Sequence, residues 1–187
     1  MIQFDMVIVG VGGQGILLAS KILGRMALDK GINVKVSEVH GMAQRGGSVI
    51  THVRLGETVY APLVAAGQAD YVVAFEELEG VRSAGFLKKD GTMVVNTQQI
   101  WPMPVITGAA EYPKNPLEEI KQNLVALDAL EMAEKAGSKR AVNVVLLGAA
   151  AKLLPFEKAD WEEAIRACVP EKTLETNLKA FALGYNL

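Results

Sequence analysis

The most restrictive feature of this sequence lies within its first twenty residues. The run Met6-Val-Ile-Val9 is short and apolar, which is typical of a buried strand. Gly10, Gly12 and Gly15 follow at once in a G-x-G-x-x-G pattern, and from Ile16 onward apolar residues recur at helical spacing. A strand, a glycine turn and a helix in this order predict the first unit of a Rossmann-like domain.

Each glycine of this turn has a predicted mechanical role. Gly10 permits a tight turn, Gly12 lets the backbone approach a ligand or a neighbouring chain, and Gly15 lets the helix pack close to the strand. With Gly13 and Gln14 they precede a helix N-terminus, whose free N–H groups and positive dipole end favour anions. We therefore predict that these five residues contact a cofactor. The pattern alone indicates the fold more strongly than it indicates a dinucleotide.

The rest of the chain alternates strands with helices and then becomes helical. Strands are expected at residues 32–36, 48–55, 58–61, 70–75, 91–96, 105–106 and 124–127, and helices at 16–28, 76–86, a short one from 116, 128–137, 141–154, 160–169 and 171–184. This order predicts an α/β fold: a single Rossmann-like domain over residues 1–187, with a mostly parallel sheet, helices on both faces and a helical C-terminal part.

Several local signals predict element boundaries. Gly56-Glu57 is typical of a hairpin turn between two strands. Asn115, Asp128 and Asp160 each stand where the side chain of an N-cap residue would accept a backbone hydrogen bond. Residues 141–154 are apolar almost all round but too few to span a bilayer, so they predict a central buried helix or one that faces another subunit.

Composition excludes several classes of protein. The net charge is −2, from 19 basic and 21 acidic residues, which argues against a nucleic-acid or membrane-surface partner. The single cysteine, Cys168, cannot build a disulfide framework or ligate an iron–sulfur cluster alone. The start of the chain lacks the pattern of a signal peptide, and no run of about 18 apolar residues occurs. We expect a soluble cytoplasmic protein. Its mean hydropathy of +0.22 suggests that partner subunits cover part of the surface.

Residues 37–47 are expected to form a loop beside the glycine turn, at the carboxyl edge of the sheet. Glu38 comes 28 residues after the first glycine of the turn, a spacing compatible with binding a ribose hydroxyl; a solvated loop carboxylate is the alternative. Arg45, beside Gly46 and Gly47, offers a planar cation and free N–H groups that suit a phosphate or carboxylate. The alternative is an arginine that fixes a loop or a subunit interface.

The remaining reactive residue types do not form a catalytic set. His40 is interpreted as a structural or interface residue, although its pKa range would suit acid–base catalysis. His52 lies in a strand and Cys168 on an apolar helix stripe, so both are expected in or near the core. With two histidines and no clustered aspartates, no metal site is expected. No nucleophile, base and oxyanion hole assemble, so no catalytic residue is predicted and the chemistry is expected to be done elsewhere.

The glycine turn and the string Glu38-Val-His-Gly-Met-Ala-Gln-Arg-Gly-Gly47 together resemble the gamma-type domain of the 2-oxoacid:ferredoxin oxidoreductases, in particular their arylpyruvate branch. Three later stretches resemble the same family: residues 128–137, 140–148 and 177–184. The resemblance covers essentially the whole chain. The extended H-G-M-A-Q-R-G-G string is its most specific part.

The resemblance implies that the catalytic cofactors lie in a different subunit from this chain. A large alpha subunit would hold thiamine diphosphate and 4Fe-4S clusters, decarboxylate an arylpyruvate such as indolepyruvate, and pass electrons to ferredoxin. The product would be an aryl-acetyl-CoA, with coenzyme A as co-substrate. The present chain would help form the coenzyme A and substrate cleft and be inactive alone. Gln44, Arg45, Gly46 and Gly47 would join the glycine turn as cofactor-binding residues. The resemblance leaves open whether Arg45 contacts coenzyme A, the substrate or the partner subunit.

Two other hypotheses stay open on sequence grounds. The same glycine turn is found in stand-alone oxidoreductases that bind NAD(P) or a flavin. The chain is also compatible with a purely structural subunit that contacts no ligand.

Overall fold

The computed structural model describes residues 2–40 and 47–187 and contains a six-stranded sheet. Its strands are β1 (Phe4–Val11), β2 (Asn33–His40), β3 (Ser48–Gly56), β4 (Ala69–Ala74), β5 (Leu87–Asn96) and β6 (Asn123–Leu127), in the spatial order β2-β3-β1-β4-β5-β6. The pairs β1–β4, β4–β5 and β5–β6 are parallel, whereas β3 pairs antiparallel with both β1 and β2. Thus β3 runs against the other five strands, and the predicted mostly parallel sheet is confirmed.

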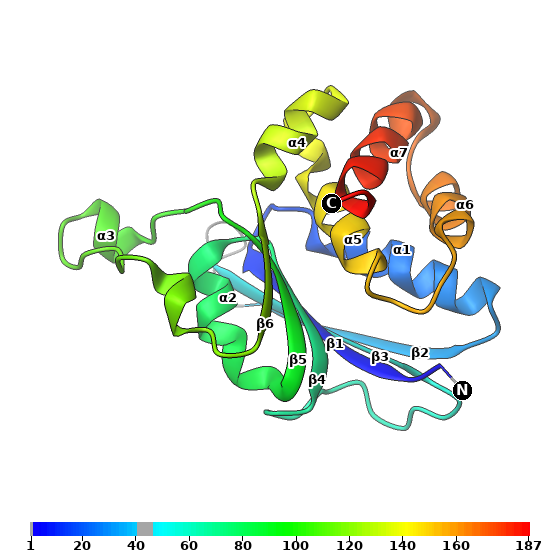
Figure 1. Ribbon diagram of the computed structural model, residues 1–187, viewed down its shortest axis with the longest axis horizontal. Coiled ribbons are helices and arrows are strands. Elements are labelled where there is room, and N and C mark those ends of the chain that lie inside the picture. The colour runs from blue at the N-terminus through cyan, green and yellow to red at the C-terminus, as the bar shows by residue number, and fades with distance from the viewer. Residues whose placement is uncertain (1, 41–46) are drawn as a thin grey trace.

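Helices cover the two faces of this sheet unequally. They are α1 (Ile16–Asp29), α2 (Glu77–Ser83), α3 (Met103–Ile106), α4 (Ala129–Ala136), α5 (Val142–Ala151), α6 (Lys158–Cys168) and α7 (Glu171–Tyr185), with short 3-10 turns η1 (Ala84–Phe86), η2 (Pro116–Glu119) and η3 (Lys139–Ala141). Helices α1 and α4–α7 lie on one face and α2 on the other (Figure 1). The prediction of helices on both faces and of a helical C-terminal part is confirmed. No helix in the described ranges is long and apolar enough to cross a membrane.

The side chains of β1 alternate between two hydrophobic cores. Met6 and Ile8 point into the larger core, under α1 and the C-terminal helices, while Val7 and Val9 point into the smaller core on the α2 side. Because successive side chains of a strand face opposite sides, an apolar run such as residues 6–9 fits only a strand buried on both faces. The glycine turn therefore follows a strand that is buried on both faces.

The predicted central helix is confirmed, because every residue of α5 is buried. It packs most extensively against α7, where the backbones approach at Gly148 and Gly184. A methyl group on Gly148 would collide with the carbonyl oxygen of Phe181, and one on Gly184 with that of Val145. Glycine at these two positions allows the two helices to touch backbone to backbone.

Two predictions around the antiparallel strand are wrong. The predicted hairpin at Gly56-Glu57 does not form, since residues 58–61 are not a strand and β3 pairs instead with β2 and β1. The loop predicted over residues 37–47 is wrong for residues 37–40, which are strand. β2 continues to His40, which lies opposite Val49, because β3 gives its backbone a hydrogen-bonding partner along this length.

The predicted N-cap residues and the predicted strand at 105–106 had different outcomes. Asp128 accepts a hydrogen bond from the N–H of Glu131 at 2.9 Å, as predicted. Helix α6, however, begins two residues before Asp160: Glu157 is the N-cap, and Asp160 accepts from the N–H of Glu157 at 3.2 Å. The predicted strand at 105–106 belongs to α3. Asn115, with φ +47°, stands at the N-cap position of η2 as predicted, but its side chain donates to the Glu118 side chain and accepts no backbone hydrogen bond.

Candidate functional site

The glycine turn lies where the direction of strand addition changes. After β1 the chain builds β2 and β3 on one side of it, and then returns to place β4, β5 and β6 on the other. Gly13 and Gly15 have φ angles of +103° and +84°, which favour glycine. The N–H of Gly12 donates to the carbonyl oxygen of Gly47 at 2.9 Å, so the end of the 37–47 segment lies beside the turn as predicted. Ligands of open α/β sheets bind at such a switch point.

Gln14 holds the turn in shape. Its side-chain Oε1 accepts from the N–H of Val11 at 2.7 Å, and its Nε2 donates to the carbonyl oxygen of Phe75 at 2.9 Å. The amide thereby links the end of β1 to the end of β4. The sequence placed Gln14 among the cofactor-binding residues, and in the structure both ends of its amide are engaged by the backbone of the fold.

Gly10 and Gly15 face different neighbours from those expected. A Cβ on Gly10 would lie 2.9 Å from the Cβ of Phe75, so this glycine admits the end of β4 as well as the turn. A Cβ on Gly15 would lie 2.6 Å from Nδ2 of Asn143, which donates to the Gly15 carbonyl oxygen at 3.1 Å. The close neighbour of Gly15 is therefore α5, and not only the strand beneath α1.

A cavity of about 390 Å³ opens beside the turn at the carboxyl edge of the sheet. We call it the glycine-turn pocket, and it is lined by Gly13, Gln14, Gly15, Gln98, Leu130, Lys139, Arg140 and Val142. Gln98 follows β5, Leu130 lies in the first turn of α4 after β6, and Lys139 and Arg140 belong to η3. Segments that are far apart in the sequence thus meet at one edge.

The charge of the glycine-turn pocket is positive. Lys139 forms an exposed ion pair with Glu134, 2.9 Å between Nζ and Oε1, whereas no described residue forms an ion pair with Arg140. The N-terminus of α1 adds its dipole and its free N–H groups. Lys139 and Arg140 were not among the site residues predicted from the sequence. Two adjacent basic residues just before a buried apolar helix were the available signal.

The structure assigns positions to only part of the predicted site. Gly10, Gly12, Gly13, Gln14 and Gly15 form the turn, and Gly47 adjoins it through its carbonyl oxygen. The predictions for Gln44, Arg45 and Gly46 lie outside the described residues.

Glu38 is distant from the glycine turn in strand order. It lies on β2, and β3 stands between β2 and β1. Its Oε1 is 2.9 Å from Nδ1 of His40, and its Oε2 accepts from the hydroxyl of Thr51 at 3.3 Å. A carboxylate two strands away and engaged with its neighbours does not match the acid that follows the second parallel strand of a dinucleotide-binding unit.

Two other residues named from the sequence are packing residues. His52 is buried in β3, where its Nδ1 accepts from the N–H of Val64 at 3.2 Å, and burial lowers its pKa. Cys168 is half-buried at the edge of the larger core, and burial raises the pKa of its thiol. A raised pKa keeps the thiol protonated near neutral pH, and a protonated thiol is a poor nucleophile. The described residues contain no group of three or more histidine, cysteine, aspartate or glutamate side chains placed to hold a metal ion.

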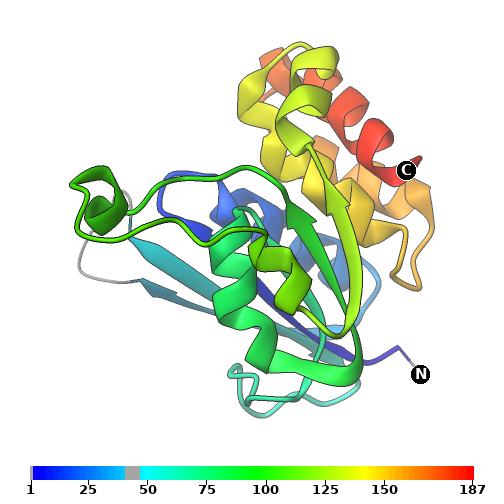
Figure 2. The same ribbon diagram turned by 60° about the vertical axis from the view of Figure 1, so that its left-hand side comes forward.

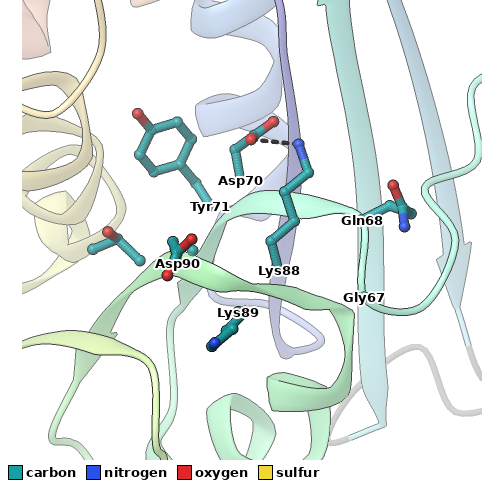
Figure 3. Close-up of a pocket in the computed structure, with 9 residues that line it drawn as sticks. Gly67, Gln68, Asp70, Tyr71, Lys88, Lys89 and Asp90 are labelled. Atoms are coloured by element: carbon teal, nitrogen blue, oxygen red, sulfur yellow. Dashed lines mark hydrogen bonds and ion pairs between the residues drawn. The ribbon is translucent and has the colours of Figure 1, made fainter.

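A second cavity, of about 470 Å³, lies at the amino ends of β4 and β5. Figure 3 shows Lys88 reaching toward Asp70 across it, with 2.6 Å between Nζ and Oδ1. The other oxygen of Asp70 accepts from the N–H of Asp5 at 2.8 Å. Because the aspartate is fully engaged and the cavity lies at the edge opposite the glycine turn, the glycine-turn pocket is the stronger candidate.

Comparison with known proteins places this geometry in a family. Residues 5–187 match the family described as "Pyruvate ferredoxin/flavodoxin oxidoreductase". The chain is 44% identical to the "Indolepyruvate oxidoreductase subunit IorB" of Archaeoglobus fulgidus, over 98% of this chain and 94% of the relative. It is 43% identical to the protein of the same name from Thermococcus kodakarensis, over 98% and 95% of the two chains.

Solved structures agree with this assignment. The gamma subunit of a keto/oxoacid ferredoxin oxidoreductase from Geobacter sulfurreducens superposes with a TM-score of 0.74 at 25% identity, over 98% of this chain and 96% of that one. In a 2-oxoglutarate:ferredoxin oxidoreductase from Magnetococcus marinus, the same fold, with a TM-score of 0.77 at 19% identity, occupies 31% of a longer chain. The resemblance drawn from the sequence is confirmed. The chain therefore belongs to the pyruvate ferredoxin/flavodoxin oxidoreductase family and has the fold of its gamma-type subunits.

Proposed function

We propose that this chain is the small subunit of a cytoplasmic arylpyruvate:ferredoxin oxidoreductase with indolepyruvate as a substrate. The observation that carries the proposal is the end-to-end similarity to proteins named as indolepyruvate oxidoreductase subunits, 44% over 98% of this chain and 94% of the relative. The match therefore extends over nearly the whole length of both chains. It also speaks against the alternative of a stand-alone oxidoreductase that binds NAD(P) or a flavin.

The redox groups are assigned to a large partner subunit. A 4Fe-4S cluster takes four thiolate ligands, and this sequence contains one cysteine. The residues of this chain therefore do not fit a cluster, and thiamine diphosphate is likewise assigned to the partner. In the proposed complex the partner decarboxylates the 2-oxoacid, electrons leave to ferredoxin, and the acyl group is transferred to coenzyme A.

The contribution of this chain is one wall of the cleft. Lys139, Arg140 and the N-terminus of α1 converge on the glycine-turn pocket, which suits the phosphates of coenzyme A or the carboxylate of a 2-oxoacid. We propose that Arg45, with Gly46 and Gly47, adds a further anion contact from the segment beside the turn. Such groups bind and orient a ligand, and they do not transfer protons or electrons.

Arg45 provides the test. In the complex reconstituted with its large subunit, Arg45→Ala is expected to remove a charge-assisted hydrogen bond of roughly 1.5–3 kcal/mol. The half-saturating concentration of coenzyme A or of arylpyruvate should then rise by about ten- to a hundredfold. Arg45→Lys should restore part of the loss, because an ammonium group lacks the bidentate geometry of a guanidinium. Arg166→Ala, which removes an exposed arginine from α6, is the matched control and should leave both saturation curves unchanged.

Each failure has a distinct meaning. If Arg45→Ala breaks the complex on gel filtration and leaves saturation unchanged, Arg45 belongs to the subunit interface and its ligand role is refuted. If the wild-type chain neither binds the large subunit nor raises its turnover with indolepyruvate above background, the proposed function is refuted as a whole.

A further inference from the structure

An apolar arm projects from the body of the molecule between β5 and η2. We define the arm as residues 97–115, with α3 at its tip. The exposed fractions of Trp101, Met103 and Ile106 are 56%, 66% and 61%. In both views α3 stands away from the sheet and from the other helices (Figure 1 and Figure 2). No charged residue occurs from Thr97 to Ala110. Within the arm, the charged residues Glu111 and Lys114 follow this stretch. Large apolar side chains gathered on an uncharged, projecting stretch are typical of an interaction site.

The base of the arm is fixed by one buried carboxylate. Glu76, which is 1% exposed, accepts through Oε1 from the N–H of Ile100 at 3.0 Å and from the hydroxyl of Tyr112 at 2.9 Å. Its Oε2 accepts from the N–H of Glu79 at 2.9 Å. The outgoing and returning sides of the arm are therefore attached to the same side chain at the N-terminus of α2.

The tip of the arm is closed by its own hydrogen bonds. The N–H groups of Val105 and Ile106 donate to the carbonyl oxygen of Pro102, at 2.9 and 3.1 Å. The N–H of Ala109 donates to the carbonyl oxygen of Pro104 at 2.8 Å. Two prolines and this turn limit the conformations open to the segment, so binding through it costs little ordering entropy.

We propose that the arm is a preformed docking element that inserts Trp101, Met103 and Ile106 into an apolar socket of the large partner subunit. This inference rests on the proposed function, which supplies that subunit. Tryptophan and methionine are enriched in the cores of protein interfaces, and tryptophan is among the residues that dominate binding energy. The arm thereby anchors the subunit that completes the cleft.

Two observations favour the large subunit over a second copy of this chain. Gln98, at the base of the arm, also lines the glycine-turn pocket, so a protein that completes this pocket lies within reach of the arm. A second copy offers no matching socket in either cavity described above. One carries Lys139 and Arg140, and the other carries Lys88 and Asp70. An uncharged apolar tip that entered either cavity would remove water from these charged side chains. It would offer them no hydrogen-bonding or ionic partner in exchange.

Binding of the purified chain to the purified large subunit, measured by biolayer interferometry, tests the arm. Trp101→Ser is expected to raise the dissociation constant at least thirtyfold, and adding Met103→Ser and Ile106→Ser should abolish binding at micromolar concentrations. Leu28→Ser is the matched control: Leu28 is 64% exposed at the far end of α1 and should leave the dissociation constant unchanged. All variants alter exposed side chains, and equal melting temperatures will verify that the fold is intact.

Three outcomes would overturn the proposal. If the triple variant binds the large subunit within twofold of wild type, the arm is not the anchor, while the proposed function stands. If the variants change only the sedimentation of the chain alone, from dimer to monomer, the arm joins two copies of this chain. If the wild-type chain does not bind the large subunit, the proposed function fails and the docking role fails with it.

Discussion

Gly15 is constrained by its backbone conformation, by a hydrogen bond to its carbonyl oxygen and by the lack of space for a side chain. Its φ of +84° favours glycine, its carbonyl oxygen accepts from Asn143, and a side chain on it would enter the space that the Asn143 amide occupies. The carbonyl oxygen of Gly15 also accepts from the N–H of Leu18 in the first turn of α1. The orientation of the helix N-terminus toward the glycine-turn pocket therefore depends on this residue.

Gly15→Ala is expected to lower the free energy of unfolding by about 2–3 kcal/mol, from left-handed backbone strain and the displaced Asn143 hydrogen bond. Gly24→Ala is the control, because Gly24 lies within α1 with no atom near its missing Cβ. That change should stabilise the protein by about 0.5–1 kcal/mol through helix propensity. Urea unfolding followed by circular dichroism measures both. Equal midpoints for the two variants would contradict the role assigned to Gly15.

Sequence reasoning could identify Gly15 but not the residue it contacts. The pattern of glycines is local, whereas Asn143 is 128 positions away and becomes a neighbour only through the packing of α5. The same holds for Gln14, whose amide reaches the carbonyl oxygen of Phe75. Asp128 was predicted correctly because an N-cap is a local feature. Asp160 was mistaken for an N-cap because it acts at the third helical position behind Glu157.

The arm is an element whose conformation depends on a few polar contacts at its base. Burial, together with the hydrogen bond to Glu76, raises the pKa of Tyr112 above its usual value of about 10. A raised pKa means that the stabilisation is complete below about pH 10 and is lost only as the pH rises through the folded-state value. The hydroxyl therefore remains a donor to Glu76 at physiological pH.

Tyr112→Phe is expected to loosen the arm while leaving the body intact. Loss of one hydrogen bond to a charged group, about 1.5–3 kcal/mol, should speed amide hydrogen exchange in residues 100–110. Exchange in β1 and β4 should not change. Tyr60→Phe is the control, since Tyr60 is almost fully exposed and the change should have no effect. Unchanged exchange in the arm of the Tyr112 variant would show that other contacts hold it.

At the scale of elements, the sequence predicted which residues form strands and helices better than it predicted which strands pair with one another. Alternation along β3 was correctly interpreted as a strand, but a hairpin with residues 58–61 was the nearest local pairing available. The observed partner β2 precedes β3 in sequence, and the second partner β1 comes earlier still. Within the arm the sequence predicted a strand at residues 105–106, which lies in α3 instead. The contacts of Glu76 with the arm could not be predicted, because they depend on where α2 lies.

The whole molecule depends on how closely the C-terminal helices can approach one another. α5 is buried on every side between the sheet and α7, and Phe181 of α7 stacks on Trp161 of α6 with 6.3 Å between ring centroids. The sequence predicted the burial of α5 from its uniform apolarity. It did not reveal that Gly148 and Gly184 set the distance between α5 and α7, because a glycine in a helix carries no signal of which backbone it faces.

Gly148→Ala tests this packing. In an isolated helix the change would be stabilising by about 0.5–1 kcal/mol. Here the new methyl group would collide with the carbonyl oxygen of Phe181 and lie 3.0 Å from the backbone nitrogen of Tyr185. Backbone atoms cannot rotate away as a side chain can, so α5 and α7 must separate. Overpacking of this kind costs about 1–3 kcal/mol or more, and we expect a net loss of about 2 kcal/mol.

Guanidinium unfolding, followed by circular dichroism and by tryptophan fluorescence, measures the loss. Gly85→Ala is the control, because Gly85 has open space around its missing Cβ and should change the midpoint little. Trp161, fully buried beside α7, should also become more accessible to quenchers in the Gly148 variant, since the helices on which it packs have shifted. A Gly148 variant with the wild-type midpoint would mean that α5 and α7 separate without cost. The close backbone contact at Gly148 would then contribute nothing to stability.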